Sequence, residues 1–395
     1  MNLDFRQKLE LWTVRLFKRI LNIVLRVCQA ILFPRKAKSP KKILVFKVGN
    51  IGDIICAIPS FIAVRKNYPG ADITLLTSPG ERGIPGAAEL LAGAWYLDKI
   101  IGYDAGELSS FAGIVRLIRK LRRERFDILV HLPADSWTNF RTLLRNMIFA
   151  RLLGVRSAFG FRVRTIINIF KKTQIDCTIG RREADTLLDI LREAGVKAGE
   201  AEFDLPIPSE AEEKARNILD EKWGAKRPKI LVAVQFGTKK NFPEKRWFPE
   251  RFSEVLEYLI REYGACAVIM GGPADTEEAN LIARNLKKEN ILVTAGKLTV
   301  IESAALLKQC SFLLSIDSGL MHIMAAFKKP TVAIFSTMNI LGLWFPYGSE
   351  HEIIYHRNLD CDYRKRECVQ RGMSLVTADE VERACDRTIK KLGLA

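Results

Sequence analysis

Two short segments combine glycine with a carboxylate directly after an apolar run. The first is Lys47-Val48-Gly49-Asn50-Ile51-Gly52-Asp53, and the second is Asp317-Ser318-Gly319-Leu320-Met321-His322. Glycine lets the backbone approach a ligand closely, and the free N–H groups at the start of a helix attract anions. A carboxylate at such a turn can take a proton from a hydroxyl or accept hydrogen bonds from sugar hydroxyls. The two segments therefore indicate chemistry on a phosphorylated, hydroxylated substrate.

The first segment lacks the G-x-G-x-x-G pattern of dinucleotide-binding proteins, because Gly49 and Gly52 are followed by Asp53. A carboxylate there would repel a pyrophosphate on the same amides, so Asp53 suits the deprotonation of a substrate hydroxyl. In the alternative interpretation, Asp53 only stabilises the start of a helix through the helix dipole. The spacing favours neither. We expect the helix to run to Lys66, with an early break at Pro59.

In the second segment, Asp317 ends a buried strand, and Ser318 and Gly319 begin an alanine-rich helix. The free N–H groups and the dipole of this helix form an anion site suited to a nucleotide pyrophosphate. The Asp317 carboxylate suits two sugar hydroxyls. His322 either donates to a phosphate or satisfies a buried carbonyl group, and the sequence leaves both open.

Two further turns offer a cation and a carboxylate. Thr238 and Lys240 follow the apolar run Ile230–Phe236 and would neutralise a diphosphate leaving group, although a single lysine at a strand end is usually solvated. Asp275 follows Gly271-Gly272 and suits a ribose hydroxyl.

The elements that must position these turns alternate apolar runs with helical patterns, which is typical of a parallel α/β sheet. The expected strands are Ile43–Val48, Ile73–Thr77, Asp127–Leu132, Ile230–Phe236, Ala267–Met270, Ile291–Thr294, Phe312–Ser315 and Thr331–Phe335. Two helices are expected as well: Ser209–Lys222, and a last helix from Thr377, whose hydroxyl and Glu380 fit a capping box.

The proline-containing stretch Ala201–Pro208 separates two halves. We expect a basic amphipathic helix and linker over residues 1–41 and two Rossmann-like domains over 42–204 and 205–395. A cleft is expected between these domains, with ligands at the carboxyl ends of the strands in both.

Composition limits the class of protein. The 395 residues are 48% hydrophobic and 27% charged, which excludes collagen, disulfide scaffolds and whole-chain disorder. The net charge of +17 predicts an anionic partner. Eight scattered cysteines predict reduced thiols, and Asp4 and Glu10 disfavour a secretory signal, so we expect a cytoplasmic protein.

The apolar stretch Leu11–Phe33 is interrupted by four cations, namely Arg15, Lys18, Arg19 and Arg26. Each would cost about 2.5–3.5 kcal/mol at the centre of a bilayer, so a membrane span is disfavoured. The polar residues fall on one side of a helix, which favours a helix lying in the plane of a membrane surface. The alternative is a helix packed on the protein's own core.

A second basic stretch, residues 136–175, holds eight Lys or Arg and no acid. Interleaved apolar residues favour contact with a phosphorylated glycolipid or a lipid headgroup, and a solvated helix face is the alternative. A zinc site is disfavoured because His351, His356, Cys361 and Cys368 match no standard finger spacing.

At these motifs the chain resembles glycosyltransferase family 9, the lipopolysaccharide heptosyltransferases, over roughly residues 42–390. The motifs are Lys47…Gly52-Asp53, Tyr68-Pro69-Gly70-Ala71-Asp72-Ile73, Lys240-x-Phe-Pro-Glu-x-x-Trp247 and Asp317-Ser318-Gly319-x-x-His322-x-x-Ala325-Ala326. The resemblance implies a GT-B fold with the acceptor in the first domain and a donor such as ADP-heptose in the second.

The resemblance also implies roles. An aspartate matching Asp53 is the general base, a lysine matching Lys240 contacts the donor phosphates, and Asp275 matches a ribose-binding acid. The donor side comprises Thr238, Lys240, Asp275, Asp317, Ser318, Gly319, Leu320 and His322, and the acceptor side Lys47, Gly49, Asn50 and Gly52. The implied reaction is an inverting displacement in which lysine and a helix terminus replace a metal, so no cofactor is expected.

We therefore predict a metal-independent glycosyltransferase, attached peripherally to the cytoplasmic face of the inner membrane, that moves a sugar from a nucleotide onto an anionic glycolipid. The alternative is a non-catalytic basic protein that binds RNA or membrane, but no nucleic-acid-binding module is recognisable. A Rossmann oxidoreductase is disfavoured because the glycine fingerprint is absent.

Overall fold

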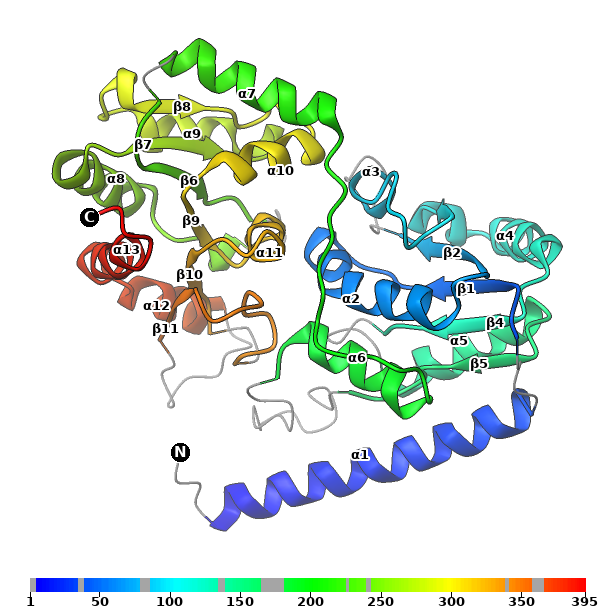
Figure 1. Ribbon diagram of the computed structural model, residues 1–395. Helices are drawn as coiled ribbons and strands as arrows, with labels where there is room; N and C mark the ends of the chain where they lie inside the picture. The colour runs from blue at the N-terminus through cyan, green and yellow to red at the C-terminus, as the bar shows by residue number, and fades with distance from the viewer. Residues whose placement is uncertain are drawn as a thin grey trace. The chain divides into compact units, whose positions relative to one another are not determined.

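The computed structural model describes residues 5–34, 39–78, 86–133, 139–164, 181–224, 227–238, 243–337, 341–356 and 366–395. The chain divides into two compact units. Unit 1 comprises Met1–Pro206 with Ile340–Leu343, and unit 2 comprises Ile207–Asn339 and Trp344–Ala395. Each unit is built on its own parallel β-sheet with helices on its faces (Figure 1).

The sheet of unit 1 has the strand order β3-β2-β1-β4-β5. Its strands are β1 (Lys42–Phe46), β2 (Asp72–Thr77), β3 (Lys99–Gly102), β4 (Ile128–His131) and β5 (Ser157–Phe159). The helices are α1 (Phe5–Leu32), α2 (Ile51–Asn67), α3 (Ala87–Leu90), α4 (Phe111–Glu124), α5 (Phe140–Leu152) and α6 (Glu183–Glu193). All pairings are parallel, with Phe46 opposite His131.

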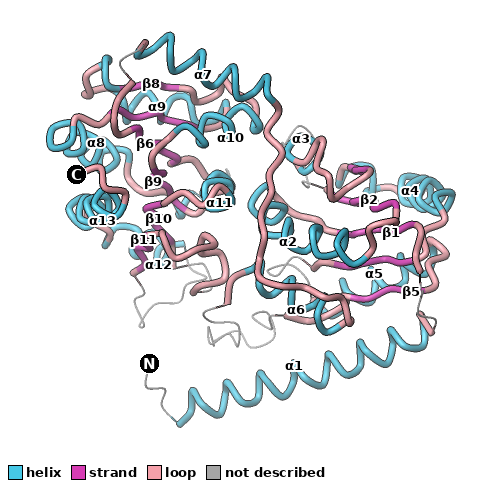
Figure 2. The backbone as a smooth tube through the Cα atoms, viewed as in Figure 1, coloured by secondary structure: helices cyan, strands magenta, loops and turns pink. Residues whose placement is uncertain are grey.

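Alternation along the strands sends side chains to opposite faces of this sheet. Leu44 and Phe46 of β1 share one core with Leu25 of α1, Leu121 of α4 and Met147 of α5. Helices α2 and α6 lie side by side on the other face (Figure 2). Burial on both faces explains why the central strands read as continuous apolar runs.

The sheet of unit 2 has the order β11-β10-β9-β6-β7-β8 and is parallel throughout. Its strands are β6 (Leu231–Gln235), β7 (Cys266–Met270), β8 (Ile291–Val293), β9 (Phe312–Ile316), β10 (Thr331–Phe335) and β11 (Glu352–Tyr355). The helices are α7 (Ser209–Trp223), α8 (Pro249–Tyr263), α9 (Thr276–Ala283), α10 (Val300–Gln309), α11 (Gly319–Ala326), α12 (Arg366–Leu375) and α13 (Ala378–Lys391). Helices α8, α9 and α13 share one core with β6 and β7.

The predicted fold class, α/β with two Rossmann-like parallel sheets, is confirmed. Each of the eight predicted strands is present, and α7 begins at the predicted Ser209. The expected break at Pro59 is wrong, because α2 continues through it to Asn67. Thr377 caps α13 as predicted by accepting from the N–H of Glu380, whose carboxylate contacts His356 instead of closing a capping box.

Helix α1 has three faces. Leu25 is fully buried in the unit 1 core, and the amide of Asn22 pairs with both backbone groups of Val163. A second face carries the basic residues that were expected on one side of the helix. A third face is apolar and exposed: Leu9, Trp12, Leu16, Ile20, Ile23, Val24, Val27 and Ile31. The helix therefore packs on the protein's own core, as the alternative prediction required, and still presents an apolar stripe to solvent.

Two further expectations concern cysteines and membrane spans. Among the described residues, five cysteines form no disulfide, but Cys368 is disulfide-bonded, so the expectation that all eight are reduced is wrong at this position. Among the helices of the described ranges, none has the length and apolarity needed to cross a membrane.

Candidate active site

In both sheets, the first strand in the sequence lies in the interior of the sheet, with strands added on both of its sides. In unit 1, β2 and β3 lie on one side of β1 while β4 and β5 lie on the other, and in unit 2 the same holds for β6. The loops at the carboxyl ends of the two strands at such a switch point diverge, and ligands of α/β sheets bind there. The Asp53 turn follows β1, Thr238 follows β6, and Asp317 follows β9. The predicted site residues therefore fall at the two switch points.

The turn after β1 holds Asp53 in one orientation. Asp53 Oδ2 accepts a hydrogen bond from the backbone N–H of Asn50 at 2.9 Å, which caps the first turn of α2. Gly49 has φ +155°, and a Cβ at this position would lie 2.4 Å from the Cβ of Asp53. The turn thus needs glycine at position 49, and the carboxylate lies at the helix N-terminus, where its negative charge is favoured. Gly52 lies in the first turn of the same helix.

Lys47, predicted on the acceptor side, is fully buried at the end of β1. Its Nζ lies 3.7 Å from Oε1 of Glu183, the first residue of α6. Arg164 binds both oxygens of the Glu183 carboxylate, at 2.8 and 2.6 Å, and donates to the carbonyl of Pro133 at 3.2 Å. Two buried cations therefore share one buried carboxylate at the end of β1, the strand that leads into the Asp53 turn.

This charge arrangement shifts the ionisation of its neighbours. Burial opposes the charged form of Glu183, but Arg164 and Lys47 outweigh it and hold the pKa of the Glu183 carboxyl below its usual range. The pKa of His131 is lowered to about 4, mainly by burial; the charge of Lys47 acts in the same direction, and the hydrogen bond to Gly160 opposes them. His131 is therefore neutral near pH 7, with Nε2 3.0 Å from the amide nitrogen of Asn146.

In unit 2, the Asp317 turn begins α11 as predicted. Ser318 is the N-cap, and its Oγ accepts from the N–H of Met321 at 3.3 Å and contacts Oγ of Ser315 at 3.0 Å. Gly319 and Leu320 form the first turn, where backbone N–H groups have no partner within the helix. His322 is buried in the same helix, with its ring edge-on to Trp344.

A lysine that the sequence analysis did not single out contacts the predicted donor loop. Lys245 Nζ lies 3.3 Å from Oδ2 of Asp317. It ends the short 3₁₀ helix Pro243–Lys245 within the Lys240-x-Phe-Pro-Glu-x-x-Trp247 motif. The predicted Lys240 lies outside the described residues. The position of Lys245 within that motif is the sequence signal that could have identified it as a candidate site residue.

Asp275 joins the turns after β6 and β7. Its Oδ2 accepts from the N–H of Gly272 at 2.8 Å, and a Cβ on Gly237 would lie 2.5 Å from the carboxylate oxygens. Thr238, next to Gly237, accepts from Arg246 Nε at 3.3 Å. Burial raises the pKa of Glu278, Arg246 opposes this rise, and the charge of Asp275 adds to it. The turn around Asp275 and Glu278 therefore has an excess of negative charge, which suits the binding of hydroxyl groups better than the binding of phosphate.

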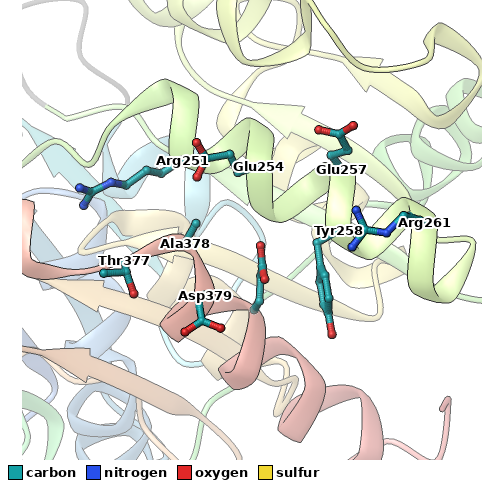
Figure 3. Close-up of a pocket in the computed structure, with 9 residues that line it drawn as sticks. Arg251, Glu254, Glu257, Tyr258, Arg261, Thr377, Ala378 and Asp379 are labelled. Atoms are coloured by element: carbon teal, nitrogen blue, oxygen red, sulfur yellow. The ribbon is translucent and has the colours of Figure 1, made fainter.

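A separate hollow of about 530 Å³ lies between α8 and the start of α13 in unit 2 (Figure 3). Four carboxylates and two arginines line it, from Arg251, Glu254, Glu257, Arg261, Asp379 and Glu382. None of the predicted donor residues belongs to its wall, and the excess of carboxylates is unsuited to a diphosphate. This hollow is therefore separate from the donor site predicted at the β6–β9 switch point.

Within the described part of the chain, no group of three or more His, Cys, Asp or Glu has the geometry of a metal site. His356 contacts Glu380, and His351 contacts the carbonyl of Tyr347. Cys361 lies outside the described residues.

Comparison with known proteins identifies the family. The family model described as glycosyltransferase family 9 (heptosyltransferase) matches residues 114–373, more than half of the chain. The chain belongs to glycosyltransferase family 9. It is therefore a glycosyltransferase, which favours catalysis over the non-catalytic alternative. The matched range includes the Asp317 turn and begins after Asp53.

Similar proteins and solved structures cover nearly the whole chain, beyond the range of the family model. The lipopolysaccharide core heptosyltransferase OpsX of Haemophilus influenzae is 22% identical over 378 residues, covering 91% of this chain and 99% of that protein. A family 9 glycosyl transferase from Veillonella parvula superposes with a TM-score of 0.72 at 23% identity, covering 90% and 99%. The ADP-heptose lipopolysaccharide heptosyltransferase II of Escherichia coli gives 0.64 at 19% identity, covering 89% and 99%. These likenesses confirm the predicted GT-B fold.

The buried carboxylate of Glu183 predicts a large loss of stability on its neutralisation. Glu183→Gln should lower the free energy of unfolding by about 3–5 kcal/mol, because it leaves two buried cations uncompensated. Urea unfolding measures this difference. The matched control is Glu193→Gln at the exposed end of the same helix, where an ion pair with Arg162 is worth about 1 kcal/mol or less. Equal losses in both variants would contradict the role of the buried cluster.

The buried imidazole of His131 predicts a pH-dependent stability. Its pKa is about 4 in the folded chain against an ordinary value of 6.5, so the unfolded chain binds this proton more readily in between. The contribution of neutral His131 to the free energy of unfolding should therefore be fully present above pH 6.5. The free energy of unfolding should fall by up to about 3 kcal/mol as the pH drops towards 4. Unfolding of wild type and His131→Gln across this range tests it, since the variant should lose this part of the slope.

Proposed function

We propose that this enzyme transfers heptose from ADP-heptose to a lipopolysaccharide inner-core acceptor, or a related glycolipid, with inversion at the anomeric carbon. The observation that carries the proposal is the placement of a carboxylate turn at each switch point, Asp53 in unit 1 and Asp317 in unit 2, in a chain of glycosyltransferase family 9. The names of the Haemophilus and Escherichia relatives, which specify lipopolysaccharide core and ADP-heptose, support this choice of substrates.

Asp53 is the proposed general base. The N–H of Asn50 and the N-terminus of α2 favour its charged form, which is the form that accepts a proton. As the acceptor oxygen attacks, its proton passes to the Asp53 carboxylate, the new C–O bond forms, and the bond from the anomeric carbon to the diphosphate breaks. An ordinary carboxylate suffices because the hydroxyl becomes acidic only as the glycosidic bond develops.

Unit 2 is the proposed donor-binding unit. The N–H groups at Gly319 and Leu320 and the dipole of α11 would stabilise the departing ADP, together with Lys240. Lys245 offsets the charge of Asp317, so that this carboxylate can accept sugar hydroxyls beside a diphosphate. Asp275 is assigned to a ribose hydroxyl. We propose that lysine and the helix terminus supply the positive charge that a divalent metal supplies in some transferases.

We propose that the enzyme is attached peripherally to the cytoplasmic face of the inner membrane through α1. The exposed apolar face of this helix supports the attachment, because scattered single apolar residues are common on protein surfaces whereas a continuous stripe is not.

The proposed base predicts the effect of Asp53→Asn. Turnover should fall by about 10²–10⁴-fold, because asparagine cannot take the proton. Its side-chain oxygen still accepts the N–H of Asn50, so α2 keeps its cap and the fold is retained. Transfer is measured with a soluble acceptor, alongside ADP binding, which should be unchanged.

The control for this variant is Asp275→Asn, which alters a carboxylate that caps its own turn in the same way. It should raise KM for the donor and leave kcat less affected. If Asp53→Asn kept most of its activity, the base would have been assigned to the wrong residue.

The proposed donor predicts which nucleotides stabilise the protein. ADP and ADP-heptose should raise the unfolding temperature without divalent metal, whereas UDP and NAD should not, and ligand at about 100 times Kd adds roughly 2.7 kcal/mol. Lys240→Ala should weaken this stabilisation. Stabilisation by a different sugar nucleotide would change the substrate, and loss of turnover on addition of a chelator would contradict the metal-independent mechanism.

A further inference from the structure

A hollow of about 1070 Å³ lies between α1 and the edge strand β5 of unit 1. Its size is that of small-molecule binding sites, which hold about 300–1,000 Å³. The cations that line it come from the basic face of α1 and from the segment after β5. They are Arg15, Lys18, Arg19, Arg26 and Arg162, and the single lining carboxylate is Glu193. The wall therefore has an excess of four positive charges.

The one carboxylate in the lining does not neutralise its five cations. Glu193 is shared between Arg162 and Arg26, the latter at 3.6 Å. Arg15 and Arg19 are exposed and have no ion-pair partner among the residues that the structure describes. Two guanidinium groups on one helix face are thus available to an anion, and arginine binds phosphate oxygens through parallel N–H donors.

The hollow also has apolar side chains beside polar ones such as Asn22, Gln29 and Ser157. Its apolar lining residues include Phe33 at the end of α1, Phe159 and Phe161 around β5, and Ile190 of α6. A free phosphate ion would leave this apolar surface uncovered. The combination of guanidinium groups with aromatic and aliphatic lining residues fits an amphiphile that carries both a phosphate and hydrocarbon.

The exposed apolar face of α1 adjoins this hollow. Ile23 belongs to both, since it is 60% exposed and also lines the hollow. Trp12 on the same face is 58% exposed, and tryptophan favours the boundary between headgroups and acyl chains. At about 100° per residue, the basic face lies between the exposed apolar face and the buried one. A lipid in the hollow would therefore have its hydrocarbon next to the stripe that enters the bilayer.

We propose that this hollow binds an anionic phospholipid of the membrane, with its phosphate against Arg15 and Arg19 and its acyl chains beside the exposed face of α1. The inference rests on the proposed membrane attachment but is independent of which sugar is transferred. It makes α1 more than an anchor, because the helix and the edge of the sheet together form a headgroup site.

Flotation with vesicles measures the contribution of the bilayer. Wild type should bind vesicles of phosphatidylcholine mixed with phosphatidylglycerol and bind pure phosphatidylcholine weakly. The double variant Arg15→Gln/Arg19→Gln should bind the anionic vesicles about thirtyfold more weakly, which corresponds to about 1 kcal/mol per charge. The control Arg116→Gln/Arg119→Gln removes two exposed charges from α4 and should change binding far less. If both double variants lost vesicle binding equally, the attraction would come from the overall charge of the protein, and the proposed site would be wrong.

A monomeric short-chain phosphatidylglycerol tests the hollow without a bilayer. It should raise the unfolding temperature of wild type and not that of Arg15→Gln/Arg19→Gln. Ile20→Ser/Val27→Ser changes exposed residues outside the hollow, so it should lose vesicle binding and keep this stabilisation. No stabilisation of wild type, equal stabilisation by inorganic phosphate, or displacement of the lipid by RNA would each overturn the proposal.

Transfer to a soluble acceptor separates this proposal from the proposed function. All of these variants should keep turnover on that acceptor and stabilisation by ADP, because neither Arg15 nor Arg19 lies near the switch points. Intact lipid binding without heptosyl transfer would count against the proposed reaction alone, and intact transfer without lipid binding would count against the hollow alone.

Discussion

The turn that carries Asp53 depends on a buried set of charges. Placing the ammonium of Lys47 in the interior costs several kcal/mol unless a carboxylate compensates it, and Glu183 does so from the first residue of α6. Arg164 fixes both oxygens of that carboxylate, and the N–H of Glu183 donates to the carbonyl of Leu343 at 2.8 Å. Strand β1, helix α6, the segment after β5 and Leu343 are therefore tied together at the end of β1, the strand that leads into the turn of the proposed base. Any change in the position of α6 would act on this turn.

The two units use one local device to orient a carboxylate. Asp53 and Asp275 each accept the N–H of the residue three positions earlier, and each packs against a glycine that could not carry a side chain, Gly49 and Gly237 respectively. Their surroundings differ in charge. The Asp53 turn lies above an excess of buried positive charge, whereas Asp275 adds to the raised pKa of nearby Glu278. In the proposed function, the same geometry orients a carboxylate that takes a proton in unit 1 and a carboxylate that accepts hydrogen bonds from ribose hydroxyls in unit 2.

Sequence patterns predicted the interior of both sheets and missed three strands, β3, β5 and β11. All three are edge strands whose side chains are only partly buried, so they leave no continuous apolar run. The turns could be predicted because glycine, cap residues and carboxylates are adjacent in the chain. Glu183 could not, because its partners Lys47 and Arg164 are distant in sequence and meet only when α6 packs on β1. Arg164 lay in a stretch assigned to acceptor contact, yet it is buried in this ion pair.

Helix α1 shows why a pattern of residue types leaves such a choice open. A helix that packs on a core and a helix that lies on a membrane both need an apolar face, and the sequence had presented them as alternatives. In α1 the buried face around Leu25 and the exposed face around Trp12 and Ile23 are separate, and the basic residues lie between them. Packing on the core fixes the rotation of the helix, which turns the basic face towards β5 and the apolar face outwards. The same contacts that hold α1 to the protein therefore create a surface suited to a membrane and a hollow suited to its headgroups.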